Sequence, residues 1–211
     1  MRFIFSIVLS TLLLWVTSLP AHSQSPGSYG IKAGFTSSSI STDMFADEIK
    51  RREGLLAVAF AEWFNTSYFS LLSELGYVQR GYNNTVEFRD PDGQSLGQKE
   101  GNLRFDYLTL AVLPKLQYSG STLQPYVLAG SRGDVLLGGE SSRSNFDPLV
   151  EQYDMVALGG IVGVGIETGK QIFPVPVFVE VRYNADITDS LSCCPRDIRN
   201  NAFDVLLGVE L

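Results

Sequence analysis

Apolar residues recur at alternate positions in segments of about ten residues along most of the chain. Successive side chains of a β-strand point to opposite faces, so this period of two predicts strands instead of helices. Eight segments show it: Tyr29–Phe35, Leu55–Phe64, Tyr68–Tyr82, Leu103–Tyr118, Gln124–Leu137, Met155–Glu167, Phe173–Asp186 and Ala202–Leu211. An even number of antiparallel strands suits a closed barrel. We therefore predict an all-β, eight-stranded, antiparallel up-and-down barrel.

The two faces of these strands differ in polarity. In the fourth segment Leu108, Leu110, Val112, Leu116 and Tyr118 share one face, and Thr109, Ala111, Lys115 and Gln117 share the other. The seventh segment places Val179, Val181 and Tyr183 opposite Glu180 and Arg182. Lipid outside and a polar lumen inside would explain this alternation. A soluble barrel with an apolar interior would explain it equally well, so parity alone leaves both open.

The links between the segments alternate in length. Short, turn-forming links at 65–67, 119–122 and 168–171 alternate with long polar ones at 37–53, 83–102, 138–153 and 187–200. Transmembrane barrels of the outer membrane have short periplasmic turns and longer extracellular loops. The alternation favours such a barrel, with both chain ends on the periplasmic side.

Aromatic residues cluster beside the short links, where rings at a lipid headgroup belt are expected. The predicted belt comprises Trp63, Phe64, Tyr68, Phe69, Tyr118, Tyr126 and Phe173. Tyr77 and Tyr183 would serve the opposite rim. Ordinary core packing is the alternative interpretation of the same residues.

The N-terminus has the features of a secretory signal. Met1-Arg2 precedes an apolar run from Phe3 to Val16, which ends before the small-residue site Ala21-His22-Ser23. That run is shorter than the roughly 20 residues of a transmembrane helix. We predict a signal peptide over residues 1–23 and one barrel domain over residues 24–211, located in the bacterial outer membrane.

Charge and composition narrow the possible functions. The chain has a formal net charge of −7, and removal of Arg2 would make it more negative. Nucleic acid is therefore not an expected partner, because contacts to phosphate need clustered basic residues. The single histidine, His22, lies in the predicted signal. Since histidine is the commonest general base near neutral pH, we expect no enzyme and no histidine metal site.

Phrases along most of residues 24–211 resemble the porin-like outer-membrane β-barrel family common in Bacteroidetes, similar in shape to the eight-stranded barrels OmpA and OmpX. The phrases are Glu74-Leu75-Gly76-Tyr77, Tyr107-Leu108 with Lys115, Gln124-Pro125-Tyr126-Val127-Leu128-Ala129-Gly130, Gly163-Val164-Gly165-Ile166-Glu167, Glu180-Val181-Arg182-Tyr183 and Asn200-Asn201-Ala202-Phe203. The resemblance implies an integral outer-membrane barrel. Pro114 departs from a regular strand and predicts a bulge or a local break.

Charged residues on the polar face are the candidate site. The predicted lumen network comprises Lys32, Glu74, Lys115, Glu180, Arg182 and Asp204, with Glu210 or Arg132 as further members. The interior of an eight-stranded barrel is just wide enough for side chains to fill, so we expect structural pairing of these charges. A narrow ion path through the same network is the functional alternative.

Two further motifs concern metal binding and disulfide formation. Asp90-Pro91-Asp92-Gly93 matches only part of a calcium loop, so a polar turn is the better interpretation and no metal or cofactor is expected. Cys193 and Cys194 are adjacent in a polar segment. A strained vicinal disulfide, an intermolecular cross-link and free thiols all remain open.

These observations lead to three candidate functions. The first is a non-enzymatic barrel, expected as a monomer, that contacts outer-membrane lipid and has an envelope-structural role or presents its long loops to a surface ligand. The second is a narrow channel or transporter for small solutes. The third is a soluble periplasmic carrier of the lipocalin kind.

Overall fold

A computed structural model describes residues 27–41, 49–64, 66–89, 95–118, 122–141, 155–169, 175–188 and 199–211. The predicted signal peptide, Phe173, the 90–93 turn and the two cysteines lie outside these residues.

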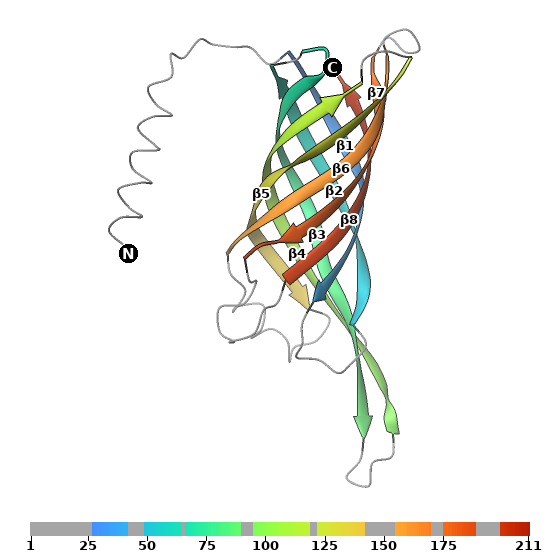
Figure 1. Ribbon diagram of the computed structural model, residues 1–211. Helices are drawn as coiled ribbons and strands as arrows, with labels where there is room; N and C mark the ends of the chain where they lie inside the picture. Colours follow the sequence, from blue (N-terminus) through green and yellow to red (C-terminus); the bar gives the residue numbers. More distant parts are fainter. Residues whose placement is uncertain are drawn as a thin grey trace, which may run out of the picture.

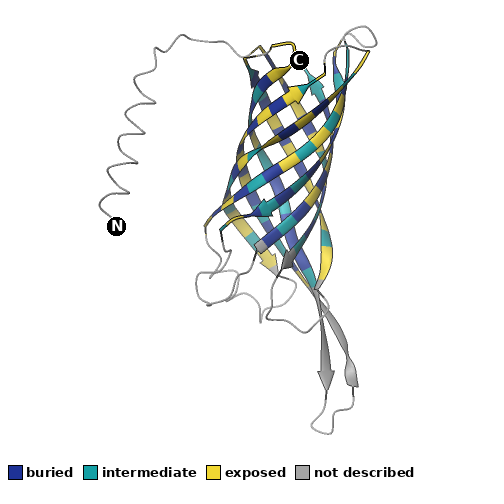
Figure 2. Ribbon diagram, viewed as in Figure 1, coloured by how far each residue is buried: buried dark blue, intermediate teal, exposed yellow. Residues whose placement is uncertain are grey.

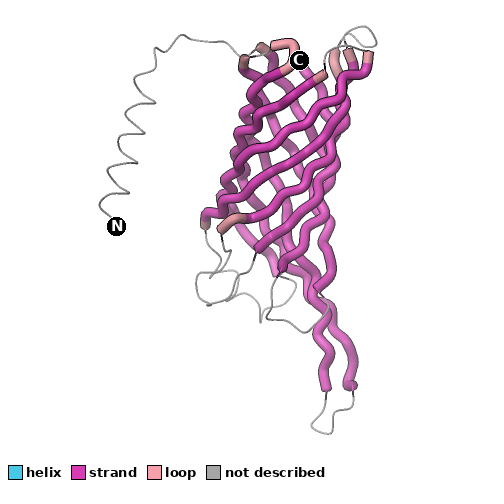
Figure 3. Tube along the Cα trace, viewed as in Figure 1, coloured by secondary structure: helices cyan, strands magenta, loops and turns pink. Residues whose placement is uncertain are grey.

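The described residues form eight strands. They are β1 (Ser28–Ser41), β2 (Ile49–Trp63), β3 (Phe69–Arg89), β4 (Ser95–Gln117), β5 (Leu123–Ser141), β6 (Val156–Thr168), β7 (Val177–Asp186) and β8 (Arg199–Glu210). Each strand pairs antiparallel with its neighbours in the sequence, and β1 pairs with β8, so the sheet closes into a barrel (Figures 1 and 3). The predicted fold class and strand number are confirmed.

The barrel has two unlike ends (Figure 1). We call the end where β2 passes into β3 and β8 stops at Glu210 the turn end, and the opposite one the loop end. At the turn end, Thr66 closes the β2–β3 link, because its amide and hydroxyl both donate to the carbonyl of Phe69, at 2.9 and 2.8 Å.

Several strands extend beyond their predicted bounds at the loop end. The clearest case is the predicted loop 83–102, most of which is strand in β3 and β4. The pairing of β2 with β3 ends at Ile49↔Asn84, and that of β5 with β4 ends at Leu103↔Ser141. Beyond these points, within the part of the chain that the structure describes, β3 and β4 pair with each other alone and project from the barrel as a ribbon (Figure 1). We call residues 85–89 and 95–101 the β3–β4 ribbon.

Exposure alternates along the strands as expected (Figure 2). In β4 and directly after it, Leu108, Leu110, Val112, Leu116 and Tyr118 are 40–63% exposed, whereas Thr109, Ala111 and Lys115 are buried. The apolar face therefore lies outside. The outward apolar stretch Leu108–Tyr118 matches the roughly 9–11 residues of a tilted transmembrane strand. Among the described residues, no helix is both long and apolar enough to span a membrane.

The predicted aromatic belt is correct in part. Phe64, Tyr68, Phe69 and Tyr118 are exposed at the turn end. Tyr126, however, is 4% exposed and points into the barrel, so its assignment to the belt was wrong. The reason is the parity of β5, in which Val127 faces outward and its neighbour Tyr126 must therefore face inward.

Pro114 interrupts one ladder without shifting its register. It pairs with Leu71 of β3, but the pairing of β4 with β5 stops at Val112↔Ser131 and resumes in the same register at Lys115↔Leu128. The missing amide hydrogen of proline explains a local break. Of the two predicted alternatives, a bulge or a local break, the structure thus has the break.

Candidate functional site

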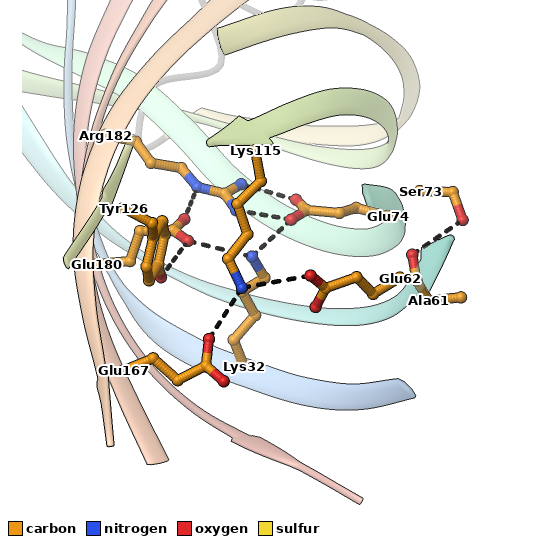
Figure 4. Close-up of polar contacts among 10 residues, drawn as sticks. All are labelled: Lys32, Ala61, Glu62, Ser73, Glu74, Lys115, Tyr126, Glu167, Glu180 and Arg182. Atoms are coloured by element: carbon orange, nitrogen blue, oxygen red, sulfur yellow. Dashed lines mark hydrogen bonds and ion pairs between the residues drawn. The ribbon is translucent and has the colours of Figure 1, made fainter. Parts of the chain in front are cut away.

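Charged side chains from β1, β3 and β7 meet in the middle of the barrel (Figure 4). The Lys32 Nζ lies 2.5 Å from Glu74 Oε1 and 3.5 Å from Glu180 Oε2. Arg182 donates through both Nη atoms to Glu74, at 2.7 and 2.6 Å, and through Nε to Glu180. Tyr126 of β5 donates its hydroxyl to Glu180 Oε2 at 2.8 Å. We call Lys32, Glu74, Glu180 and Arg182 the middle cluster.

The middle cluster is balanced and sealed. Two cations face two carboxylates, and each of the four side chains is no more than 3% exposed. The bidentate contact between Arg182 and Glu74 is the strongest geometry for such a pair. Because β-strand parity places Glu180 and Arg182 on the same face of β7, the adjacent charges come from a single i, i+2 spacing.

A second group lies nearer the turn end. The Lys115 Nζ contacts Glu167 Oε2 at 2.8 Å and Glu62 Oε1 at 3.4 Å. The same nitrogen lies 4.7 Å from the centre of the Tyr126 ring, a cation–π distance. We call Glu62, Lys115 and Glu167 the turn-end cluster.

Three interior rings fill the space around these charges. Phe60 and Phe178 meet edge to face, with centroids 5.6 Å apart, and Lys32 Nζ lies 5.2 and 5.5 Å from their centres. Each of these three rings has a glycine as its direct cross-strand partner. Phe60 lies opposite Gly30, Tyr126 opposite Gly165 and Phe178 opposite Gly208. A Cβ at Gly165 would lie 2.2 Å from Tyr126 Cζ, and one at Gly208 would lie 2.1 Å from Phe178 Cζ. The rings therefore occupy the space that glycine leaves free.

A third group lies nearer the loop end. Arg80 Nη1 contacts Asp134 Oδ2 at 2.5 Å, and Arg132 forms ion pairs with both Asp134 and Asp186. Asp204 lies on β8 and accepts a hydrogen bond from Asn184 Nδ2 at 2.7 Å. We call Arg80, Arg132, Asp134, Asp186 and Asp204 the loop-end cluster.

Little free space remains beside the middle and turn-end clusters. A cavity of about 10 Å³ lies among Lys32, Phe60, Lys115, Tyr126 and Phe178 together with Glu62, Glu167, Glu180 and Glu210. This volume holds about one water molecule. Larger hollows, of about 800 and 610 Å³, are lined mostly by outward-facing apolar residues such as Val127, Val164 and Leu207. Lipid chains would cover those surfaces.

The structure places all six predicted lumen residues inside the barrel, each no more than 4% exposed. Lys32, Glu74, Glu180 and Arg182 contact one another, whereas Lys115 belongs to the turn-end cluster. Asp204 lies in the loop-end cluster, where it accepts a hydrogen bond from Asn184. Arg132, a further candidate, lies in the loop-end cluster, and Glu210 lines the small cavity.

Sequence reasoning missed five buried charges. They are Glu62, Arg80, Asp134, Glu167 and Asp186. Parity could have found Glu62, because it follows Leu56, Val58 and Phe60 on the inner face of β2. Within the described ranges, no group of three or more His, Cys, Asp or Glu side chains is arranged to hold a metal ion.

A closed eight-stranded barrel with an apolar outer band and a charged, filled interior defines a transmembrane β-barrel of the outer membrane. The family model described as outer membrane protein beta-barrel domain matches residues 22–192. The chain belongs to this family and is an outer-membrane protein. This result, together with the charged interior, contradicts the soluble-carrier alternative. A comparison with curated proteins gives no match.

Several solved structures are similar to this chain at low sequence identity. NspA, a neisserial surface protein, is 15% identical, with 87% of this chain and 97% of NspA covered and a TM-score of 0.49. Ail of Yersinia pestis, solved with the heparin analogue sucrose octasulfate, is 14% identical over 89% of this chain and 100% of Ail, with a TM-score of 0.45. The outer membrane enzyme PagL is 13% identical over 83% of this chain and 97% of PagL, with a TM-score of 0.41.

Proposed function

We propose that this protein is a non-enzymatic, monomeric outer-membrane barrel that presents its loop end, above all the β3–β4 ribbon, to a partner at the cell surface. The ribbon is the observation that carries the proposal. Beyond Asn84 and Leu103, its two strands pair with each other and with no other strand of the described residues, so the described barrel wall does not need them. A hairpin that extends past the wall leaves its backbone edges available for a partner strand.

The interior supports a structural role for the buried charges. In the middle cluster every charge has an opposite partner, and the rings of Phe60, Phe178 and Tyr126 fill the space beside it. Ion flow would have to break these buried pairs, which is strongly unfavourable. We therefore expect no open pore.

The residues usually used as a general base in catalysis are missing or held in ion pairs. Residues 24–211 contain no histidine, and each carboxylate of the middle and turn-end clusters is held by a lysine or arginine. A carboxylate held in an ion pair is a poor general base near neutral pH. This supports a non-enzymatic barrel.

The proposal requires the ribbon to lie outside the cell. We would replace Cys193 and Cys194 with serine and introduce Gly97→Cys in the ribbon. A membrane-impermeant maleimide should label this variant on intact cells. The matched control is Thr122→Cys at the turn end, which should be labelled only after lysis. Labelling of Thr122→Cys but not of Gly97→Cys on intact cells would mean that the barrel has the opposite orientation in the membrane. This result would overturn the proposal.

Conductance separates this proposal from the channel alternative. The refolded protein should produce no unitary currents in planar bilayers, whereas a narrow channel would produce them reproducibly. Steady single-channel current steps from the folded protein, absent when an unfolded sample is added, would overturn the surface-presenting role in favour of transport.

A further inference from the structure

The loop-end cluster carries more negative than positive charge. Arg80 and Arg132 supply two guanidinium groups, against the three carboxylates of Asp134, Asp186 and Asp204. All five side chains are no more than 5% exposed. Uncompensated charge in such a place is costly, so something must balance it.

Within the loop-end cluster, the carboxylate that lacks an ion pair among the described residues is Asp204. Seven carboxylates are buried in the part of the chain that the structure describes: Glu62, Glu74, Asp134, Glu167, Glu180, Asp186 and Asp204. Six form an ion pair with a lysine or arginine, and Asp204 does not. Its Oδ2 accepts the neutral amide of Asn184, while its Oδ1 has no hydrogen-bond partner among the described residues.

The nearest basic residues are engaged elsewhere. Arg182 is the direct cross-strand partner of Asp204 on β7, but its guanidinium is held by Glu74 and Glu180 of the middle cluster. Arg132 attracts Asp204 electrostatically, but its ion pairs are with Asp134 and Asp186. Neither can turn to Asp204 without leaving two other carboxylates with less charge compensation.

Thr36 adds a second unsatisfied oxygen at the same place. It is the direct cross-strand partner of Asp204 on β1, and both residues are on the inner face of the barrel. Thr36 is 1% exposed, and its Oγ1 likewise has no hydrogen-bond partner among the described residues. A carboxylate oxygen and a hydroxyl oxygen side by side are ligands that hard cations prefer.

We propose that Asp204 and Thr36 bind one small alkali-metal cation, Na⁺ or K⁺, inside the loop-end half of the barrel. One positive charge balances the one unpaired carboxylate. A divalent or transition metal does not fit, because no group of three acidic, histidine or cysteine ligands exists in the described part of the chain. Water completes the coordination shell, and the site does not depend on the role of the ribbon.

Binding to the folded state alone stabilises it in proportion to the logarithm of ligand concentration. The refolded protein in neutral lipid vesicles should therefore resist urea better in NaCl or KCl than in choline chloride at the same ionic strength. Choline is too large for a buried site and serves as the matched salt. The measured quantity is the urea midpoint over a hundredfold range of salt concentration.

Three variants make the test specific. Asp204→Asn should have the same midpoint in all three salts, and in choline chloride it should be no less stable than the wild type. Thr36→Val keeps the shape of the side chain but removes the hydroxyl, and should weaken the response to Na⁺. Asp186→Asn, which alters a paired carboxylate, should lower the midpoint but keep that response.

Two results would overturn the proposal. A clear loss of stability of Asp204→Asn in choline chloride would mean that protein charges already balance Asp204. Equal midpoints of the wild type in NaCl and choline chloride, with stability that falls between pH 5 and 8, would mean that Asp204 carries a proton. If Asp204→Asn does not fold, the salt dependence of the wild type and of Thr36→Val still decides the question.

Discussion

The middle and loop-end clusters lie in one barrel interior, but their buried charges are balanced differently. In the middle cluster, Lys32 and Arg182 are matched one for one by Glu74 and Glu180. In the loop-end cluster, two arginines face three carboxylates, and among the described residues Asp204 forms no ion pair. The middle cluster is thus complete with protein atoms alone, whereas the loop-end cluster needs a further ligand.

Unsatisfied polar atoms follow the same division. Buried atoms without a hydrogen-bond partner include Thr36 Oγ1, Arg80 Nε, Arg132 Nε, Asp134 Oδ1 and Asp204 Oδ1, all in or beside the loop-end cluster. The middle cluster contributes none to the described set. Buried polar groups normally find partners, so water or an ion is expected at these particular atoms, among buried apolar side chains such as Leu103, Phe105 and Leu206 that fill much of the same half. The difference teaches that one barrel interior can hold both a fully paired charge cluster and a cluster whose polar atoms lack protein partners.

The largest expected loss of stability comes from removing a charge of the middle cluster. Arg182→Ala leaves Glu74 and Glu180 with Lys32 as their one remaining cation, in a region where water cannot enter easily. Removal of one partner from such a buried network costs about 3–5 kcal/mol. Urea unfolding of the refolded protein in vesicles would measure the loss. The control is Arg104→Ala, whose ion pairs with Asp106 and Glu140 are partly exposed and should contribute about 0–1 kcal/mol. Equal effects of the two variants would contradict a sealed middle cluster.

The corresponding change in the loop-end cluster should cost less. Arg80→Ala removes the 2.5 Å contact to Asp134, but Asp134 keeps its ion pair with Arg132. Water or a cation can then replace the lost guanidinium, so we expect about 1–3 kcal/mol from the same unfolding measurement. A cost equal to that of Arg182→Ala would remove the distinction between the two halves.

Much of the fold could be predicted from alternation alone. The outward and inward positions of β4, β7 and β8 follow the pattern of Leu108, Val179 and Val205 on one side and Lys115, Glu180 and Asp204 on the other. Parity has this power because a shift by one residue would expose every charge to lipid. The sequence predicts a loop for the ribbon, since residues 83–102 are mostly polar and show no row of alternating apolar residues.

Pairing within the interior could not be predicted in the same way. Tyr126 was assigned to the belt because a ring beside a turn suits both the headgroups and the lumen. The lack of an ion pair at Asp204 depends on where Arg182 points, and Arg182 turns to Glu74, 108 residues away in sequence. Such choices follow from distances across the barrel, which a single sequence does not contain.

The packing of the interior rings beside the middle cluster can be tested at their glycine partners. Gly165→Ala would place a Cβ 2.2 Å from Tyr126 Cζ, and the ring cannot move freely because its hydroxyl is bonded to Glu180. Overpacking of this kind costs about 1–3 kcal/mol. Gly160→Ala on the same strand is the control, because its Cβ would meet nothing closer than the carbonyl oxygen of Gly130 at 3.8 Å. If both variants unfold at the same urea concentration, Tyr126 does not pack against Gly165.

The smallest effect is expected on the outer face near the loop end. The Arg51 guanidinium lies 5.1 Å from the centre of the Phe203 ring, which in turn lies 4.9 Å from Tyr183. Arg51→Ala removes a cation–π contact at an exposed site, worth about 0.5–1 kcal/mol. Arg51→Lys should recover part of this value, since a lysine retains the charge. The contrary result would be a loss of unfolding free energy as large as that of Arg182→Ala in the same vesicles. It would mean that the outer face near the loop end contributes as much to stability as the buried middle cluster, which contradicts the comparison between the clusters.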